Sequence, residues 1–165
     1  MKVYGVMQSY TNLVNTLKSK GLYDKNNPPV VSAGASLVLY GVKKETDDLD
    51  VSVSKEIWDA LDIPEVEGIS VKIKRLRDAT VGCDIDIHID DGYEFSKLVH
   101  FFMKGMEKVS SLNIAELINE RKRLGREKDM AAIKLIDDWV DAGGDCEGRI
   151  VIIIPGSAIS ISGLN

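Results

Sequence analysis

The chain has little cysteine and no long apolar run, and these two features argue against a disulfide-rich protein and against a membrane-spanning protein. Only two of its 165 residues are cysteines, Cys83 and Cys146, which is too few for a disulfide framework. The longest wholly apolar stretch is Ile150 to Ile154, whereas a membrane helix needs about 20 apolar residues. Met1 to Asn15 lacks the charged start and apolar run of a secretory signal. We therefore expect a cytoplasmic protein with no membrane partner.

An excess of positive charge is also missing. The 26 acidic and 21 basic residues give a net charge of −5, which argues against non-specific binding to nucleic acid, because that binding needs a basic face. A local basic groove is still compatible with this balance, since basic residues gather between Arg121 and Lys128. Hydrophobic residues make up 44% of the chain and charged residues 28%, as in an ordinary globular domain with its own core.

Apolar periodicity predicts helices interspersed with strands, and therefore an α+β fold with a mixed sheet flanked by helices. Apolar residues three or four positions apart predict a helix, and alternating ones predict a strand. The predicted helices are Met7–Leu22, Ala33–Gly41, Lys55–Leu61, Phe95–Met106, Ile114–Leu124 and Glu127–Val140. The predicted strands are Val30–Val31, Leu49–Ser54, Ile69–Lys74, Cys83–Ile89 and Ile150–Ile154.

The last residues differ in character from the rest of the chain. Ile150 to Ile154 strongly favours a strand, Pro155 interrupts it, and Ile159 and Ile161 then alternate with serines. We predict one domain over residues 1–146, ending in a helical part, and a β-forming tail over residues 147–165. An exposed tail of this kind would be prone to aggregate. We therefore expect it to pack on its own domain or to pair with a second copy in a homodimer.

Two Asp-x-Asp units are the most informative feature of the sequence. Asp48 and Asp50 form the first, and Asp84 and Asp86 form the second. Strand alternation places both members of each unit on one face. Four like charges on a sheet repel unless cations neutralise them, and Mg²⁺ is commonly held by one or two carboxylates together with substrate phosphates. The alternative is a strand face that simply meets water, because such spacings also arise by chance.

The segment before Asp48 adds groups that favour phosphate. Gly34 lies where a short helix is predicted to begin, and the unsatisfied N–H groups of a helix start favour an anion. The loop from Lys43 to Thr46 adds cations and a hydroxyl. An anion site directly before paired carboxylates predicts an enzyme that holds a nucleoside triphosphate and metal ions.

These residues resemble the pattern of minimal nucleotidyltransferases in the DNA polymerase β-like superfamily. The similarity is greatest to the abortive-infection and toxin–antitoxin nucleotidyltransferases. It rests on Gly34-Ala35-Ser36-Leu37, Gly41, Lys44, Thr46, Asp48 and Asp50, and on a later helical motif with Lys122, Arg126, Lys128, Asp129 and Ile133. The chain departs from the pattern at Ala33, where a glycine is usual, at Lys44, where an arginine is usual, and at Ala132, where an aspartate often follows.

The resemblance implies transfer of a nucleoside monophosphate from a nucleoside triphosphate to a hydroxyl, with Mg²⁺ or Mn²⁺ as cofactor and release of pyrophosphate. The acceptor would be the 3′ end of a tRNA, a protein hydroxyl or a small molecule, and the subgroup implies a role in toxin–antitoxin systems or phage defence. The metal ligands and catalytic residues would be Asp48, Asp50 and Asp86, with Asp86 favoured over Asp84. The phosphate-binding residues would be Gly34, Ser36, Lys44, Thr46, Lys122 and Arg126, supported by Asp84 and Asp129.

Two other interpretations stay open. The departures at Ala33, Lys44 and Ala132 fit a non-catalytic module that binds a nucleotide or a partner protein. The other interpretation is a structural domain whose acidic face binds divalent cations incidentally.

Overall fold

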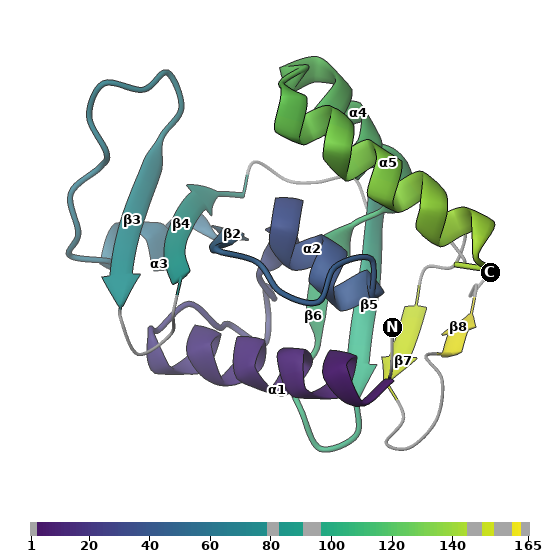
Figure 1. The fold of residues 1–165 in the computed structure, drawn as a ribbon. Helices are drawn as coiled ribbons and strands as arrows, with labels where there is room; N and C mark the ends of the chain where they lie inside the picture. Colours follow the sequence, from purple (N-terminus) through teal and green to yellow (C-terminus); the bar gives the residue numbers. More distant parts are fainter. Residues whose placement is uncertain (1–2, 79–82, 91–96, 145–149, 154–159, 163–165) are drawn as a thin grey trace.

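A mixed β-sheet flanked by helices forms the body of the protein (Figure 1). The computed structural model describes residues 3–78, 83–90, 97–144, 150–153 and 160–162. The sheet runs in the order β3-β4-β2-β1-β6-β5-β7-β8, which confirms the predicted α+β class. The helices are α1 (Val3–Ser19), α2 (Ala33–Tyr40), α3 (Lys55–Ala60), α4 (Ile114–Leu124) and α5 (Glu127–Asp141). The strands are β1 (Val30–Ser32), β2 (Asp48–Val53), β3 (Ile73–Asp78), β4 (Cys83–Ile89), β5 (Leu98–Met103), β6 (Val109–Leu112), β7 (Ile150–Ile153) and β8 (Ser160–Ser162).

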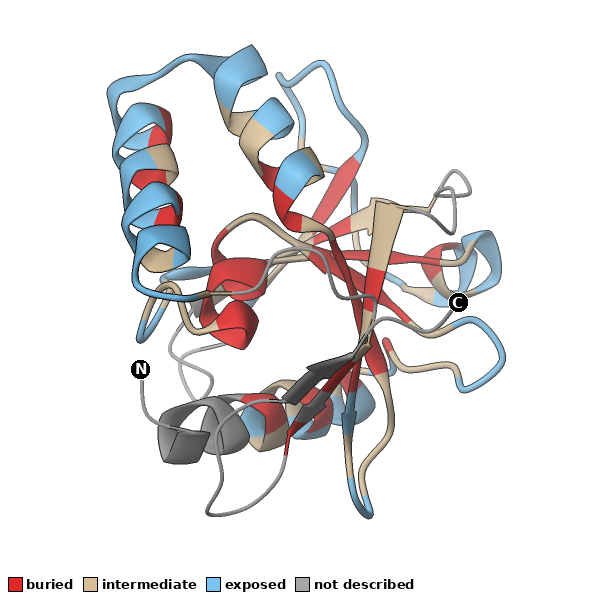
Figure 2. Cartoon of the chain, turned by 90° about the vertical axis from the view of Figure 1, so that its right-hand side faces the viewer, coloured by how far each residue is buried: buried red, intermediate tan, exposed pale blue. Residues whose placement is uncertain are grey.

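The core lies at the centre of the sheet and around α2. Strands β2 and β4 are parallel, with Leu49 opposite Ile85 and Val51 opposite Ile87, and all four side chains are buried. Helix α2 is buried from Gly34 to its end, whereas α4 and α5 expose most of their surface (Figure 2). Burial of one large apolar side chain stabilises a fold by about 1.5–3 kcal/mol. The strands that carry the Asp-x-Asp units are therefore anchored in the hydrophobic core.

The predicted helix Phe95–Met106 is wrong, because its described part contains the strand β5. This strand lies between β6 and β7, and Phe101 within it is fully buried. The Tyr10 hydroxyl donates to the Phe101 carbonyl at 2.9 Å. Burial alternates along β5, with Val99 and Phe101 buried and Phe102 37% exposed. Because the residues on both faces are mostly apolar, the sequence shows no alternation of apolar and polar residues, and periodicity does not distinguish such a segment from a helix.

The predicted strand Ile69–Lys74 is displaced from the real one. Ile69 and Val71 are 45% and 55% exposed, and β3 begins only at Ile73. The cause is Lys74, which is buried and donates from Nζ to the Trp58 carbonyl at 2.8 Å and the Leu61 carbonyl at 2.9 Å. Lys74 occupies this buried position because its ammonium group binds carbonyls at the end of α3. The alternation of buried and exposed residues in β3 therefore does not appear in the sequence as an alternation of apolar and polar residues.

The described part of the tail extends the same sheet. Strand β7 is parallel to β5, with Val151 opposite Phe101, and β8 is antiparallel to β7. Val151 and Ile153 are buried. Residues 147–149, 154–159 and 163–165 lie outside the described part of the chain, and the homodimer stays a prediction. Among the helices that the structure describes, none combines the length and apolar character that crossing a membrane requires.

Candidate functional site

Strands β2 and β4 bring the two Asp-x-Asp units side by side. Their parallel register places Asp48 opposite Asp84 and Asp50 opposite Asp86. Because side chains alternate between the faces of a strand, these carboxylates share the face opposite the buried isoleucines. The side chains of Asp50 and Asp86 are 22% and 17% exposed. Both carboxylates are therefore partly shielded from water.

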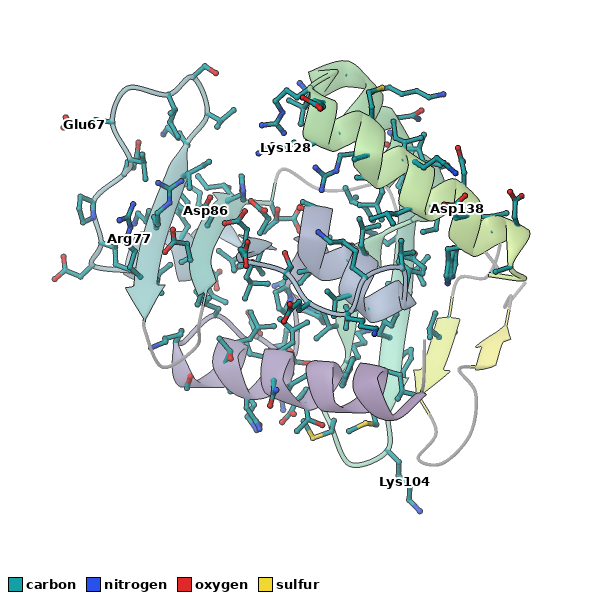
Figure 3. The ribbon with its side chains drawn as sticks, viewed as in Figure 1. Glu67, Arg77, Asp86, Lys104, Lys128 and Asp138 are labelled. Carbon is teal, nitrogen blue, oxygen red and sulfur yellow. The ribbon has the colours of Figure 1, made fainter. Side chains whose placement is uncertain are left out.

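A cavity of about 670 Å³ lies over this face, a volume in the range of small-molecule sites. Charged groups of both signs line it, and Figure 3 shows Asp86 on β4 and Lys128 near the start of α5 on opposite sides. The acidic lining residues are Asp47, Asp48, Asp50, Asp86 and Glu120, and the basic ones are Lys43, Arg75, Arg121, Arg126 and Lys128. A site with balanced charges of this kind suits a ligand that carries phosphates together with cations.

The start of α2 forms another part of the cavity wall. Ser32, Ala33 and Gly34 line the cavity, and the N-cap residue Ser32 makes no side-chain hydrogen bond to the first turn. The Ser32 side chain therefore leaves the first N–H groups of this helix uncapped, and such groups attract an anion. Ala33 has φ 54°, in the left-handed region. The alanine thus adopts a backbone conformation that favours the glycine usual at this position in the resembled family.

Gly34 is required by its close approach to the loop before β2. A Cβ at this position would overlap Thr46 Oγ1 and lie 3.2 Å from Thr46 Cβ. The Thr46 hydroxyl in turn donates to the Asp48 carbonyl at 3.1 Å and accepts from the Asp48 N–H at 3.3 Å. Thr46 therefore packs against Gly34 at the start of α2 and hydrogen-bonds to the backbone of Asp48, the first metal-ligand candidate.

Two of the carboxylates already have partners within the protein. Asp86 accepts two hydrogen bonds from Arg75, at 2.6 Å from Nε and 3.2 Å from Nη2. These bonds raise the pKa of the Arg75 guanidinium above its usual value. Asp50 Oδ1 lies 3.1 Å from Nε2 of His88. The acidic face is thus neutralised in part by Arg75 of β3, while His88 of β4 contacts Asp50.

The facing wall is organised by a buried carboxylate on α5. Asp129 is fully buried and accepts hydrogen bonds from Arg126 Nε at 2.7 Å and Arg121 Nη1 at 2.9 Å. These bonds, with those from Arg126 the stronger cause, hold the pKa of Asp129 well below its usual range. Gly125, with φ 64°, ends α4 between the two arginines. The guanidinium groups of two different helices are in this way fixed beside the cavity.

No protein-family model and no curated protein sequence matches the chain. Among solved structures, it is similar to a protein from Thermotoga maritima described as a "putative nucleotidyltransferase". The two are 17% identical, the match covers 81% of this chain and 93% of that chain, and the TM-score is 0.49. A likeness of this degree carries no argument about function, which has to come from the site itself.

The structure brings together only part of the predicted site. Asp48, Asp50, Asp86, Gly34, Thr46 and Arg126 all line the cavity. Ser36 is instead buried and accepts a hydrogen bond from the Ser111 hydroxyl at 2.7 Å. Asp84 is 44% exposed and lies 4.0 Å from Arg77. Lys44 and Lys122 are exposed and lie outside the cavity lining.

Lys43, Arg75, His88 and Arg121 are among the lining residues that the sequence did not assign to the site. Arg121 had a recognisable signal, because it is one turn from Leu117 and Leu124, which line the same cavity. His88 had one too, since alternation places it on the face of Asp86. Arg75 had none, because its position depends on the antiparallel register of β3 against β4.

Proposed function

We propose that the protein is a nucleotidyltransferase that moves a nucleoside monophosphate from a nucleoside triphosphate to a hydroxyl. The observation that carries this proposal is the meeting of Asp48, Asp50 and Asp86 with the start of α2 around one cavity. In the reaction, the acceptor oxygen bonds to the α-phosphorus and the bond to the bridging oxygen breaks. Pyrophosphate leaves, and a carboxylate takes the hydroxyl proton.

The chain's own groups would orient the triphosphate between the two walls. The N–H groups at the start of α2 would bind one phosphate, since Ser32, Ala33 and Gly34 line the cavity. Arg126 and Arg121, held by Asp129, would bind other phosphate oxygens from the facing wall, since guanidinium groups match phosphate geometry. Asp86 would receive the proton of the acceptor.

Mg²⁺ or Mn²⁺ is the cofactor that this donor set would take. Asp48 and Asp50 supply the one or two carboxylates by which Mg²⁺ is usually held together with phosphate oxygens. In the described residues, no three His, Cys, Asp or Glu side chains are arranged as ligands of one ion. Asp86 is held by Arg75 and would join Asp48 and Asp50 only after Arg75 releases it. When bound, the ion would polarise the phosphate and stabilise the charge of the leaving oxygen.

Label transfer tests the proposal directly. The protein is incubated with each α-³²P nucleoside triphosphate, Mg²⁺ or Mn²⁺, and either total RNA or cell lysate. We expect label on an acceptor with the wild type and with Asp59→Asn, which removes an exposed carboxylate of α3. We expect a loss of at least about 100-fold with Asp48→Asn and Asp50→Asn, as for removal of a charge that stabilises the transition state. Transfer that survives both substitutions would contradict the assignment.

The form of the labelled product identifies the acceptor. Label on RNA supports a tRNA 3′ end, label on protein supports a hydroxyl side chain, and a small labelled product supports a small molecule. A role in toxin–antitoxin systems or phage defence is tested separately, by whether expression of the wild type but not Asp48→Asn arrests growth.

One observation favours a second candidate function, a nucleotide-binding module without catalysis. Arg75 engages Asp86 and His88 engages Asp50, so the carboxylates have internal partners. This alternative predicts that a nucleoside triphosphate binds and protects the protein against thermal unfolding, while no acceptor is ever labelled.

A further inference from the structure

Arg75 is built into the acidic face of the cavity. Strand β3 is antiparallel to β4, with Arg75 directly opposite Asp86, so the backbone register fixes this pair. Both carboxylate oxygens of Asp86 accept from the guanidinium, at 2.6 Å and 3.2 Å. The negative charges of Asp84 and Asp48 further raise the pKa of Arg75. One guanidinium therefore acts as counter-ion to the carboxylates of both Asp-x-Asp units.

The neighbouring arginine of β3 shows that this arrangement is specific. Arg77 lies opposite Asp84, but the two are 4.0 Å apart and the Arg77 side chain is 74% exposed. The Arg75 side chain is 32% exposed and lines the cavity, whereas Arg77 does not. Figure 3 shows Arg77 on the side of β3 away from Lys128. Arg77 thus provides a matched control with the same charge on the same strand.

The geometry has a direct consequence for a divalent cation. A carboxylate whose two oxygens are held by a guanidinium has to lose that partner before it coordinates a metal ion, and the positive charge of the guanidinium opposes the ion. A triphosphate removes this obstacle, because it offers the guanidinium another anion of matching geometry. The Arg75–Asp86 ion pair therefore weakens the binding of a divalent cation on its own, but not of a cation that binds together with a triphosphate.

We propose that Arg75 couples metal binding to nucleotide binding. It holds Asp86 in the resting site and moves to the phosphates when the metal arrives with a nucleoside triphosphate. This inference rests on the proposed function and adds to it that the ion enters as a complex with the nucleotide. Because coupling is reciprocal, the nucleotide strengthens metal binding by the same factor as the metal strengthens nucleotide binding.

Binding of Mn²⁺ alone, measured by electron paramagnetic resonance without nucleotide, tests the first half of the inference. We expect Arg75→Gln to bind Mn²⁺ about tenfold more tightly than the wild type, within the usual range of coupling factors. Arg75→Lys keeps the charge but loses the two-pronged hydrogen bonding, and it should lie between them. Arg77→Gln should stay within about twofold of the wild type, because Arg77 does not hold a cavity carboxylate. Equal affinity of Arg75→Gln and the wild type would overturn the inference.

The wild type alone tests the second half, so the result does not depend on any variant folding. The Nε–H signal of Arg75 is followed by ¹H–¹⁵N NMR together with the backbone amide of Gly34. We expect Mg²⁺ alone to leave the Arg75 signal in place and at least one magnesium nucleoside triphosphate to shift it. A Gly34 amide that shifts while the Arg75 signal stays fixed would overturn the inference and leave the proposed function intact. If no magnesium nucleotide shifts either signal, both fail.

Discussion

Ala33 adopts a backbone conformation that costs free energy for every residue with a Cβ. Its φ of 54° lies in the left-handed region, and no other non-glycine residue in the described ranges has a positive φ. Glycine avoids this cost, which is about 1–2 kcal/mol, but loses more entropy on folding. We predict that Ala33→Gly raises the free energy of unfolding by about 0.5–1 kcal/mol, measured by urea denaturation.

Ala35→Gly is the matched control for this prediction. Ala35 lies in the same helix and is buried, without a positive φ. Its replacement should lower the free energy of unfolding by about 1 kcal/mol, since glycine is unfavourable inside a helix. Two substitutions that act in the same direction would show that Ala33 is not strained.

Asp129 links stability to pH through its two arginine partners. Its pKa is lowered in the folded protein, chiefly by hydrogen bonds from Arg126 and then from Arg121, relative to 3.8 for the unperturbed group. A carboxyl whose folded pKa is depressed stabilises the fold above its unfolded pKa and loses that effect as pH falls toward the folded value. We predict that Asp129→Asn is clearly less stable than the wild type at pH 7 and that the gap narrows below about pH 4.

Urea midpoints measured at pH 7, 5, 3.5 and 2.5 check the Asp129 prediction. The control is Asp138→Asn, which removes an exposed carboxylate of the same helix paired with Lys134. It should change stability little, because exposed ion pairs contribute about 0–1 kcal/mol. A difference between wild type and Asp129→Asn that is constant over the whole pH range would contradict the linkage.

At the level of residues, the sequence identifies groups that are close along the chain better than groups that meet across it. Asp48, Asp50 and Gly34 belong to one short segment, and alternation alone places Asp86 on the correct face. The pairing of Arg75 with Asp86 depends on strand register, which one sequence does not encode locally. The choice of Arg121 over Lys122 likewise depends on which face of α4 meets the cavity.

At the level of elements, most helices were predictable, including the buried α2, whereas the inner strands β5 and β6 were not. Helix α4 has its predicted bounds, and α5 and β4 agree closely, because each has one polar and one apolar face. Strand β5 lies inside the sheet and was predicted as a helix, and β6, with the sequence Val-Ser-Ser-Leu, was not predicted at all. Its two serines are buried by pairing with other polar groups, which hides its strand character.

The turn between α4 and α5 depends on Gly125. With φ 64°, this residue ends α4, and its Cβ would meet only Lys122 O at 3.7 Å, so backbone strain rather than crowding limits substitution. We predict that Gly125→Ala lowers the free energy of unfolding by about 1 kcal/mol. Gly125→Asn should cost less, because asparagine tolerates the left-handed region. Thermal and urea unfolding measure both variants, and equal costs for the two would argue against a backbone origin.

At the scale of the whole molecule, the site exists only because the sheet order brings distant segments together. β1 lies between β2 and β6, so the start of α2, the carboxylates of β2 and the helices after β6 surround one cavity. The sequence indicated a mixed sheet but not this order, which follows from packing of the complete chain. The meeting of the carboxylates of β2 and β4 with the arginines of the helical wall is therefore a property of the topology.

The two ends of the described chain also belong to one packed unit. Figure 1 shows the start of α1 beside β7, and these elements are in contact. Ile153 in β7 is 1% exposed and belongs to the same hydrophobic core as Val14 and Phe101. We predict that Ile153→Ala lowers the free energy of unfolding of the whole protein by about 2–5 kcal/mol, as for other large-to-small core changes.

Urea unfolding followed by both tryptophan fluorescence and far-UV circular dichroism checks this last prediction. If β7 is part of the cooperative core, both signals shift together in Ile153→Ala and remain one transition. Val140→Ala, at a 38% exposed position of α5, should change stability by less than about 0.5 kcal/mol. A main transition that is unchanged in Ile153→Ala would mean that β7 unfolds independently of the core. The parallel pairing of β7 with β5 and the burial of Val151 argue for the cooperative outcome, because loss of β7 would uncover the inner strand β5.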